Sequence, residues 1–166
     1  MHRVHKGTPP RLAFVFPTDT PPLYLLTFNT HLRQRLLAAP EVHAAFRAFA
    51  ERAAEYRIGV GRYVLMPDHV HLFVRFAGGL TLGSWVKSLK QTLGKTLAAL
   101  GHEPAQIPGT RLRSFWQPGV HDHLLRHDES YAQKWHYLWM NPVRAGLVST
   151  PEEWPYQGEI VLIDRA

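Results

Sequence analysis

The stretch from Tyr63 to Phe76 constrains the fold more than any other part of the chain. It has the pattern of two apolar strands that pair antiparallel across a short turn at Pro67-Asp68. Because side chains alternate between the faces of a strand, His69 and His71 share one face of the second strand with Phe73 and Arg75. The stretch therefore predicts a sheet whose one face directs two imidazoles toward a single point, as a metal site requires.

The flanking segments alternate between strand and helix patterns. We predict a first strand at 24–30, and the paired strands run over 58–66 and over 70–76, the strand of the two histidines. A strand-like segment at 111–125 and an apolar edge strand at 160–163 follow. Helices are predicted at 40–56, 81–100 and 128–141, with Thr81 and Asp128 as N-caps of the last two. This order predicts an α+β fold, a ferredoxin-like sandwich with helices on one face of an antiparallel sheet. Residues 1–166 are interpreted as one domain, with residues 1–21 as a loose N-terminal arm.

Charge and composition narrow the choice of partner. The formal net charge is +6, which favours a polyanion such as nucleic acid, because binding to phosphates releases counterions. There is no cysteine, so disulfides, zinc-thiolate sites and thiol catalysis are excluded. The longest apolar runs are far shorter than a membrane span, so we predict no membrane association and a cytoplasmic protein.

The histidine pair by itself leaves three chemistries open. With eleven histidines in the chain, such a pair arises easily by chance, and His121 and His123 form a second one. A two-histidine phosphodiesterase would need His-x-Ser/Thr motifs, which neither pair supplies. A zinc hydrolase would need a third strong ligand and a carboxylate base, and nothing in the sequence assigns Asp68 or Asp122 to that role. A tyrosine nucleophile assisted by a metal ion needs fewer groups, namely a cation at the phosphate oxygen and a phenol held in line with the bond that breaks.

A tyrosine with suitable neighbours lies in the last predicted helix. Tyr137 and Asn141 are spaced i and i+4, so they stack on one helix face, which Lys134 shares. That face differs from the apolar stripe of the same helix. Pro142 disfavours helical geometry at the residue before it, which predicts a distorted last turn.

Three motifs, in this order, resemble those of the REP-associated tyrosine transposases, which belong to the single-tyrosine HUH transposases of the insertion-sequence type. They are Met66-Pro67-Asp68-His69-Val70-His71-Leu72, Phe115-Trp116-Gln117 and the segment from Tyr137 to Val148. The resemblance runs from about Tyr24 to Tyr156. It implies His69 and His71 as metal ligands, Asn141 as the third ligand and Tyr137 as the nucleophile. Two imidazoles with an amide oxygen suit Mg²⁺ or Mn²⁺. Asp68 departs from the family, which more often has Asn there.

The activity implied by the resemblance is cleavage and rejoining of single-stranded or hairpin DNA through a 5′-phosphotyrosine intermediate. The expected substrates are repetitive palindromic elements, and the protein is expected to act as a monomer rather than a homodimer. Arg33, Lys87, Lys90 and Arg144 are candidate contacts to the DNA backbone. The alternative is a non-catalytic regulatory protein, derived from a transposase, that binds hairpin or single-stranded nucleic acid.

Overall fold

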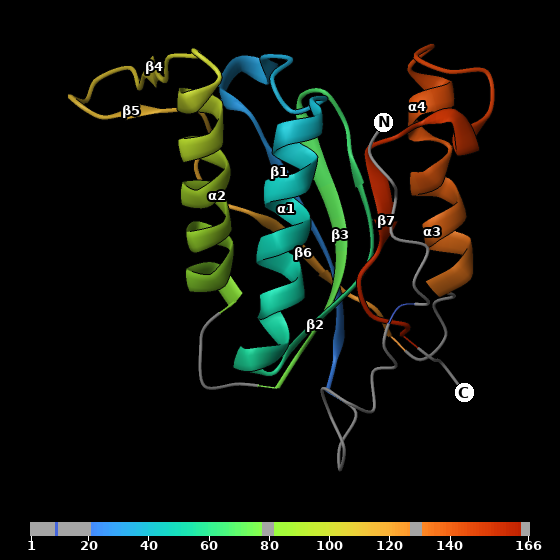
Figure 1. Cartoon of the computed structure of the whole chain (residues 1–166). Helices are drawn as coiled ribbons and strands as arrows, with labels where there is room; N and C mark the ends of the chain where they lie inside the picture. Colours follow the sequence, from blue (N-terminus) through green and yellow to red (C-terminus); the bar gives the residue numbers. More distant parts are fainter. Residues whose placement is uncertain (1–8, 10–20, 78–81, 127–130, 164–166) are drawn as a thin grey trace.

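A computed structural model describes residues 9, 21–77, 82–126 and 131–163 of the chain. Its main sheet has five antiparallel strands in the order β6-β1-β3-β2-β7 (Figure 1). The strands span Leu23–Asn29 (β1), Ile58–Leu65 (β2), His69–Phe76 (β3), His121–Leu124 (β6) and Gln157–Glu159 (β7). A separate two-stranded ribbon pairs β4, Ala105–Gln106, with β5, Arg113–Ser114. The predicted antiparallel α+β sandwich is confirmed.

Helices lie on both sides of the main sheet. The long helices α1 (Pro40–Arg52) and α2 (Leu82–Ala99) cover one face, and α3 (Tyr131–Trp139) and α4 (Asn141–Arg144) lie on the other side (Figure 1). Phe46 of α1 packs on Tyr63, which pairs with Leu72, so the first two helices cover the wholly apolar face of β3. Phe73 packs edge-on against Tyr131, so α3 covers the histidine face. The prediction that helices cover one face only is therefore wrong, because the helix pattern does not indicate which face of the sheet each helix packs against.

The C-terminal segment packs against the sheet at a bulge in β2. The β2–β3 register shifts between Val60 and Tyr63. Gly61, within this bulge, leaves room for Ile163, because an added Cβ would lie 2.3 Å from the Cδ1 atom of that side chain. The prediction of an edge strand at 160–163 is wrong, since the strand is β7 and ends at Glu159. Ile160, Val161 and Ile163 instead complete the buried core.

The other predicted boundaries agree closely, and short 3-10 turns, η2 (His31–Arg33), η3 (Ala53–Tyr56) and η4 (Pro151–Glu153), fill in the connections. The strand-like segment at 111–125 contains β5 and β6. The predicted distortion near Pro142 is present, because α3 ends at Trp139 and α4 begins at Asn141. Asn141 itself is helical, so the break falls at Met140, one residue earlier than expected. The predicted caps Thr81 and Asp128, and the predicted arm except Pro9 and Pro21, lie outside the described residues.

Candidate functional site

Both histidines of β3 stand on the same face of the central strand. β3 pairs with β1 on one side and β2 on the other, and its register with β1 places Asn29 opposite His69 and Thr27 opposite His71. The two rings are nearly perpendicular, with centroids 4.7 Å apart. The predicted convergence of the two imidazoles is therefore present in the fold.

His71 is the more deeply placed of the pair. Its Nδ1 atom lies 2.7 Å from the Oγ1 atom of Thr27. Burial, together with positive charge from His69, Arg33 and Arg144, lowers the pKa of His71 to about 3. The ring is consequently neutral at physiological pH, which is the form of histidine that binds metals.

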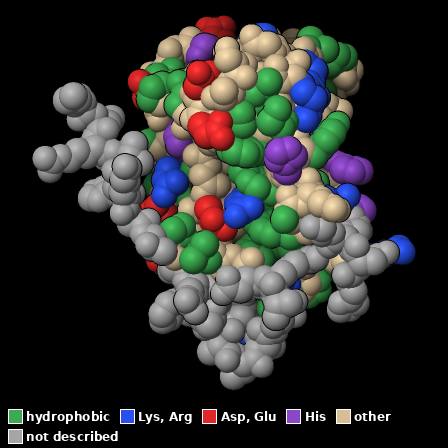
Figure 2. All heavy atoms as spheres, turned by 90° about the vertical axis from the view of Figure 1, so that its right-hand side faces the viewer, with side chains coloured by type: hydrophobic (Ala, Val, Ile, Leu, Met, Phe, Trp, Pro, Cys, Tyr) green, Lys and Arg blue, Asp and Glu red, His purple; other side chains and the backbone are tan. Residues whose placement is uncertain are grey.

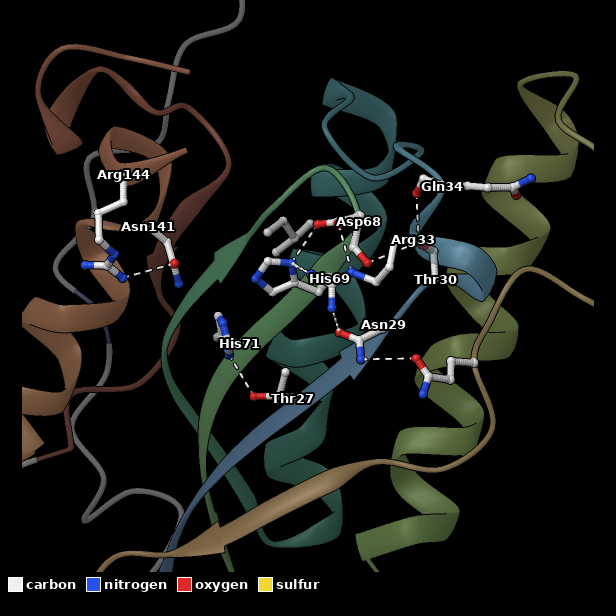
Figure 3. Close-up of polar contacts among 12 residues, drawn as sticks. Thr27, Asn29, Thr30, Arg33, Gln34, Asp68, His69, His71, Asn141 and Arg144 are labelled. Carbon is white, nitrogen blue, oxygen red and sulfur yellow. Dashed lines mark hydrogen bonds and ion pairs between the residues drawn. The ribbon is translucent and has the colours of Figure 1, made fainter. Parts of the chain in front are cut away.

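His69 belongs to a charged network at the β2–β3 turn (Figure 3). Its Nδ1 atom lies 2.7 Å from Oδ1 of Asp68, whose Oδ2 accepts a hydrogen bond of 2.9 Å from Nε of Arg33. Burial lowers the pKa of His69, although the Asp68 carboxylate opposes the shift. Burial alone would raise the pKa of Asp68, but the hydrogen bonds from His69 and Arg33 outweigh it and keep the carboxyl ionised.

A strained loop holds Arg33 in this network. Leu32 and Arg33 have positive φ angles of 52° and 56°, a left-handed conformation that costs energy in residues with a Cβ. The buried Thr30 fastens the loop, because its hydroxyl contacts the carbonyl oxygens of Gln34 at 2.7 Å and Asp68 at 3.1 Å. The guanidinium of Arg33 also donates to the side-chain oxygen of Asn29 at 3.0 Å.

Asn141 and His69 lie on one cavity of about 400 Å³, even though 72 positions separate them in the numbering. Its wall also includes Arg33, Arg35, Met66, Pro67, Asp68, Arg144, Ala145 and Leu147. His71 does not line this cavity, but its ring lies beside that of His69, with the two centroids 4.7 Å apart. The side-chain oxygen of Asn141 accepts a hydrogen bond of 3.0 Å from Nη2 of Arg144. The structure thus brings together two of the three predicted metal ligands at the cavity, with the third beside them.

Tyr137 lies outside that cavity. Its side chain is 65% exposed and lines a neighbouring hollow of about 640 Å³, together with His136, Met140 and Arg144 among others. The guanidinium of Arg144 lies 4.0 Å from the centroid of the Tyr137 ring, and its Nη2 atom donates to the Tyr137 carbonyl at 2.6 Å. Arg144 lines both spaces and therefore stands between the predicted nucleophile and the predicted ligands.

The four predicted DNA contacts fall into two groups. Arg33 and Arg144 lie at the cavity, whereas Lys87 and Lys90 lie on α2, which covers the opposite face of the sheet. Lys87 is exposed. Lys90 directs its ammonium at the carbonyl oxygens of Gln117 (3.2 Å) and Gly119 (2.5 Å), and burial lowers its pKa. Lys90 thus stabilises the segment that precedes β6, a use that competes with phosphate binding.

Three polar residues near the histidines were missed in the sequence. Thr27 and Asn29 reach them only through the β1–β3 register, which leaves no local signal. Gln117 accepts a hydrogen bond of 3.3 Å from Asn29, and its place in the Phe115-Trp116-Gln117 motif was the signal that could have indicated it. The exposed His121 of the second pair lies opposite Thr27, in the same row as His71.

The described residues contain no group of three or more His, Cys, Asp or Glu side chains that could hold a metal ion. A site built on the β3 pair therefore needs an oxygen ligand of another kind, which the amide of Asn141 can supply.

None of the described helices combines the length and the apolar character that a membrane span requires.

Comparisons with known proteins give consistent matches. The family model described as "Transposase IS200 like" matches residues 23–124, more than half of the chain, and this segment includes β3 but ends before α3. A Haemophilus influenzae (strain ATCC 51907 / DSM 11121 / KW20 / Rd) protein assigned as a REP-associated tyrosine transposase is 24% identical over 139 residues, 81% of this chain and 77% of that protein. The REP-associated tyrosine transposase of Escherichia coli (strain K12) is 20% identical over 134 residues, 80% and 73% of the two chains.

A solved structure is similar as well. A REP-associated tyrosine transposase bound to a REP hairpin superposes with a TM-score of 0.62 at 21% identity, and the match covers 84% of this chain and 77% of that one. At this identity the likeness establishes the shared fold.

Proposed function

The chain belongs to the IS200-like transposase family, and from this premise we propose that it cuts and rejoins single-stranded or hairpin DNA with Tyr137 as nucleophile. Support for the nucleic-acid partner comes from the net charge of +6 and from the relatives, one of which was solved with a REP hairpin. On the side that carries α3 and α4, acidic side chains gather in the left half of Figure 2 and most of the histidine surface lies in the right half. A phosphate backbone is repelled least where the carboxylates are few.

The observation that carries the proposal is the convergence of β3 and α4 on one cavity. In Figure 3, the ring nitrogens of His69 and His71 that face away from Asp68 and Thr27 point into the space between β3 and Asn141. Two neutral imidazoles and an amide oxygen fit Mg²⁺ or Mn²⁺, with positions left for water and phosphate. A bound ion of this kind would supply positive charge at the phosphoryl oxygen, where the transition state gains negative charge.

The covalent step is a transesterification. The Tyr137 hydroxyl oxygen attacks the phosphorus, forming an oxygen–phosphorus bond as the bond to the 3′ oxygen breaks. The strand on the 3′ side of the break then remains attached to Tyr137 through its 5′-phosphate. The phenolic proton is lost to solvent, and the leaving oxygen takes up a proton to become the free 3′-hydroxyl of the other strand end. Rejoining reverses these steps with the 3′-hydroxyl of another strand end. Arg33 and Arg144 line the cavity wall, where their guanidinium groups would bind the neighbouring phosphates.

One observation favours the alternative, a hairpin-binding protein without cleavage. Arg144 stacks on the Tyr137 ring and donates to the oxygen of Asn141, so in this arrangement the predicted ligand atom is already hydrogen-bonded and Tyr137 is held at the neighbouring hollow. Binding would need only the charge and the fold, whereas cleavage needs Tyr137 to leave its position beside Arg144 and turn toward the cavity.

The two functions are separated by a search for the covalent intermediate. The protein is incubated with Mn²⁺ and hairpin DNAs that carry a label on the 3′ side of the candidate break, and the products are run on a denaturing gel. We expect a labelled protein band for at least one repeat-derived hairpin, and its loss in His69→Ala and His71→Ala variants that still bind the same hairpin. Binding without any adduct across the series would leave the non-catalytic function. Sedimentation with and without hairpin tests the predicted monomer.

A further inference from the structure

The two histidines of β3 are each held at Nδ1 by a neighbouring side chain. We propose that Asp68 and Thr27 are positioning residues that keep His69 and His71 as Nδ1–H tautomers, so that both Nε2 lone pairs face the space in front of Asn141. This inference rests on the proposed metal-binding role of the pair, but the tautomers themselves are a property of the protein alone.

The geometry at His69 leaves one tautomer. An ionised carboxylate only accepts hydrogen bonds, so the 2.7 Å contact with Asp68 requires a proton on Nδ1. Nη2 of Arg33 lies 3.2 Å from the same nitrogen, and it could donate there only if Nδ1 carried no proton. The shorter contact with the charged acceptor prevails. Since Oδ2 of Asp68 accepts from Arg33, both carboxylate oxygens are committed, and Asp68 acts by orienting His69 rather than as a ligand or base.

The geometry at His71 relies on a neutral acceptor. The 2.7 Å contact with Thr27 shows that Nδ1 of His71 is hydrogen-bonded, but a threonine hydroxyl can donate or accept, so the contact does not itself locate the ring proton. The surroundings of the other ring nitrogen, Nε2, assign it. The Nε2 end points into the space shared with His69 and Asn141 (Figure 3), where a metal ligand needs a lone pair. The Nδ1 proton then goes to Thr27, which is partly exposed and can give its own proton to water.

The test reads the tautomers directly, without metal or DNA. Long-range proton–nitrogen NMR spectra of the ¹⁵N-labelled protein near neutral pH distinguish the two tautomers of each ring, and His69→Gln and His71→Gln spectra assign the signals. We expect Nδ1–H for both rings in the wild type. In Thr27→Val, which keeps the branched shape, His71 should move toward the Nε2–H form while His69 is unchanged. Thr27→Ser, which retains a hydroxyl, should restore the wild-type pattern.

Metal affinity gives a second readout. Calorimetric titration with Mn²⁺ alone should show binding weakened about tenfold or more in Thr27→Val and in Asp68→Ala, as expected for loss of such orienting groups. Thr27→Ser and Asp68→Asn should bind nearly as wild type, because each keeps an acceptor. Thr96→Val, a similar change on α2, controls for the substitution itself.

Two results would overturn the proposal. One is an Nε2–H form of either ring in the wild type, and the other is a Thr27→Val spectrum in which His71 keeps its tautomer. The covalent-adduct experiment does not bear on these signals, so the absence of nuclease activity beside the expected tautomers would reject the proposed function and leave this inference standing.

Discussion

The guanidinium of Arg144 lies 4.0 Å from the ring centroid of Tyr137, and the two residues are joined again by a 2.6 Å hydrogen bond to the Tyr137 carbonyl. This carbonyl stands in the last turn of α3, where the helix breaks and its carbonyl oxygens lose intrahelical partners. Arg144 caps it from α4. The same side chain that connects the two helices therefore also holds the predicted nucleophile.

Replacing Arg144 by alanine is expected to lower the free energy of unfolding by about 1 kcal/mol, the net worth of a hydrogen bond of this kind. Lysine should recover the charge but not the stacking and the fork of hydrogen bonds, since its ammonium is a single point. Urea unfolding measures both. Arg111→Ala, an exposed arginine between β4 and β5, is the matched control and should change stability by less than about 0.5 kcal/mol. An equal loss in both alanine variants would contradict a capping role.

Tyr137→Phe should abolish the DNA adduct and leave the fold intact, because the change removes only a hydroxyl from a side chain that is 65% exposed. Tyr56→Phe removes the same group from a tyrosine that is 55% exposed at the end of η3, and it should form adduct at the wild-type level. Gel analysis of the two variants side by side provides the measurement. An adduct that persists in Tyr137→Phe would assign the nucleophile elsewhere.

Protonation of His43 should destabilise the fold in mild acid. Burial, assisted by Arg47, lowers the pKa of His43 to about 4, from about 6.5 in an unfolded chain. The unfolded state therefore binds more protons between these values, so the His43 contribution is complete above about pH 6.5 and is lost as pH falls toward 4. Arg47 is close to the imidazole through a shared neighbour, since its Nη1 atom donates to the Tyr63 hydroxyl at 2.9 Å and that oxygen lies 2.8 Å from Nε2 of His43.

The measurement is urea unfolding of wild type and His43→Gln at several pH values. The difference between the two proteins cancels the shared contribution of His69 and His71, whose lowered pKa values act in the same direction. We expect the wild type to lose more stability than the variant as pH falls from 7 to 5. Parallel curves would show that His43 does not titrate in this range.

Gly61→Ala should destabilise the protein by about 1–3 kcal/mol, the usual cost of overpacking a core. A Cβ at this position would lie 2.3 Å from Cδ1 of Ile163 and 3.0 Å from the hydroxyl of Tyr131, so these two buried side chains would have to shift. Gly83→Ala is the matched control on α2, where no atom lies within 4 Å of the added carbon. There the change should be neutral or stabilising by up to about 1 kcal/mol. Thermal unfolding compares the two.

The sequence predicted the local elements and the identity of the candidate residues well. Strand alternation put His69 and His71 on one face, and Pro142 predicted the break between α3 and α4, because both effects act within a few residues of chain. The misplaced edge strand at 160–163 shows the limit of such patterns. Those apolar residues are buried by a bulge around Gly61, a hundred positions earlier, which no local periodicity records.

The motifs by themselves therefore determined which residues are candidates, and tertiary structure decided what each one contacts. Strand register brings Thr27 to His71, the turn and the strained loop bring Asp68 and Arg33 to His69, and the packing of α4 brings Asn141 to the same cavity. The structure also separates Tyr137 from that cavity by Arg144. These relationships depend on which elements pair and pack across long sequence separations, and that choice follows from burial of the whole core rather than from any single motif.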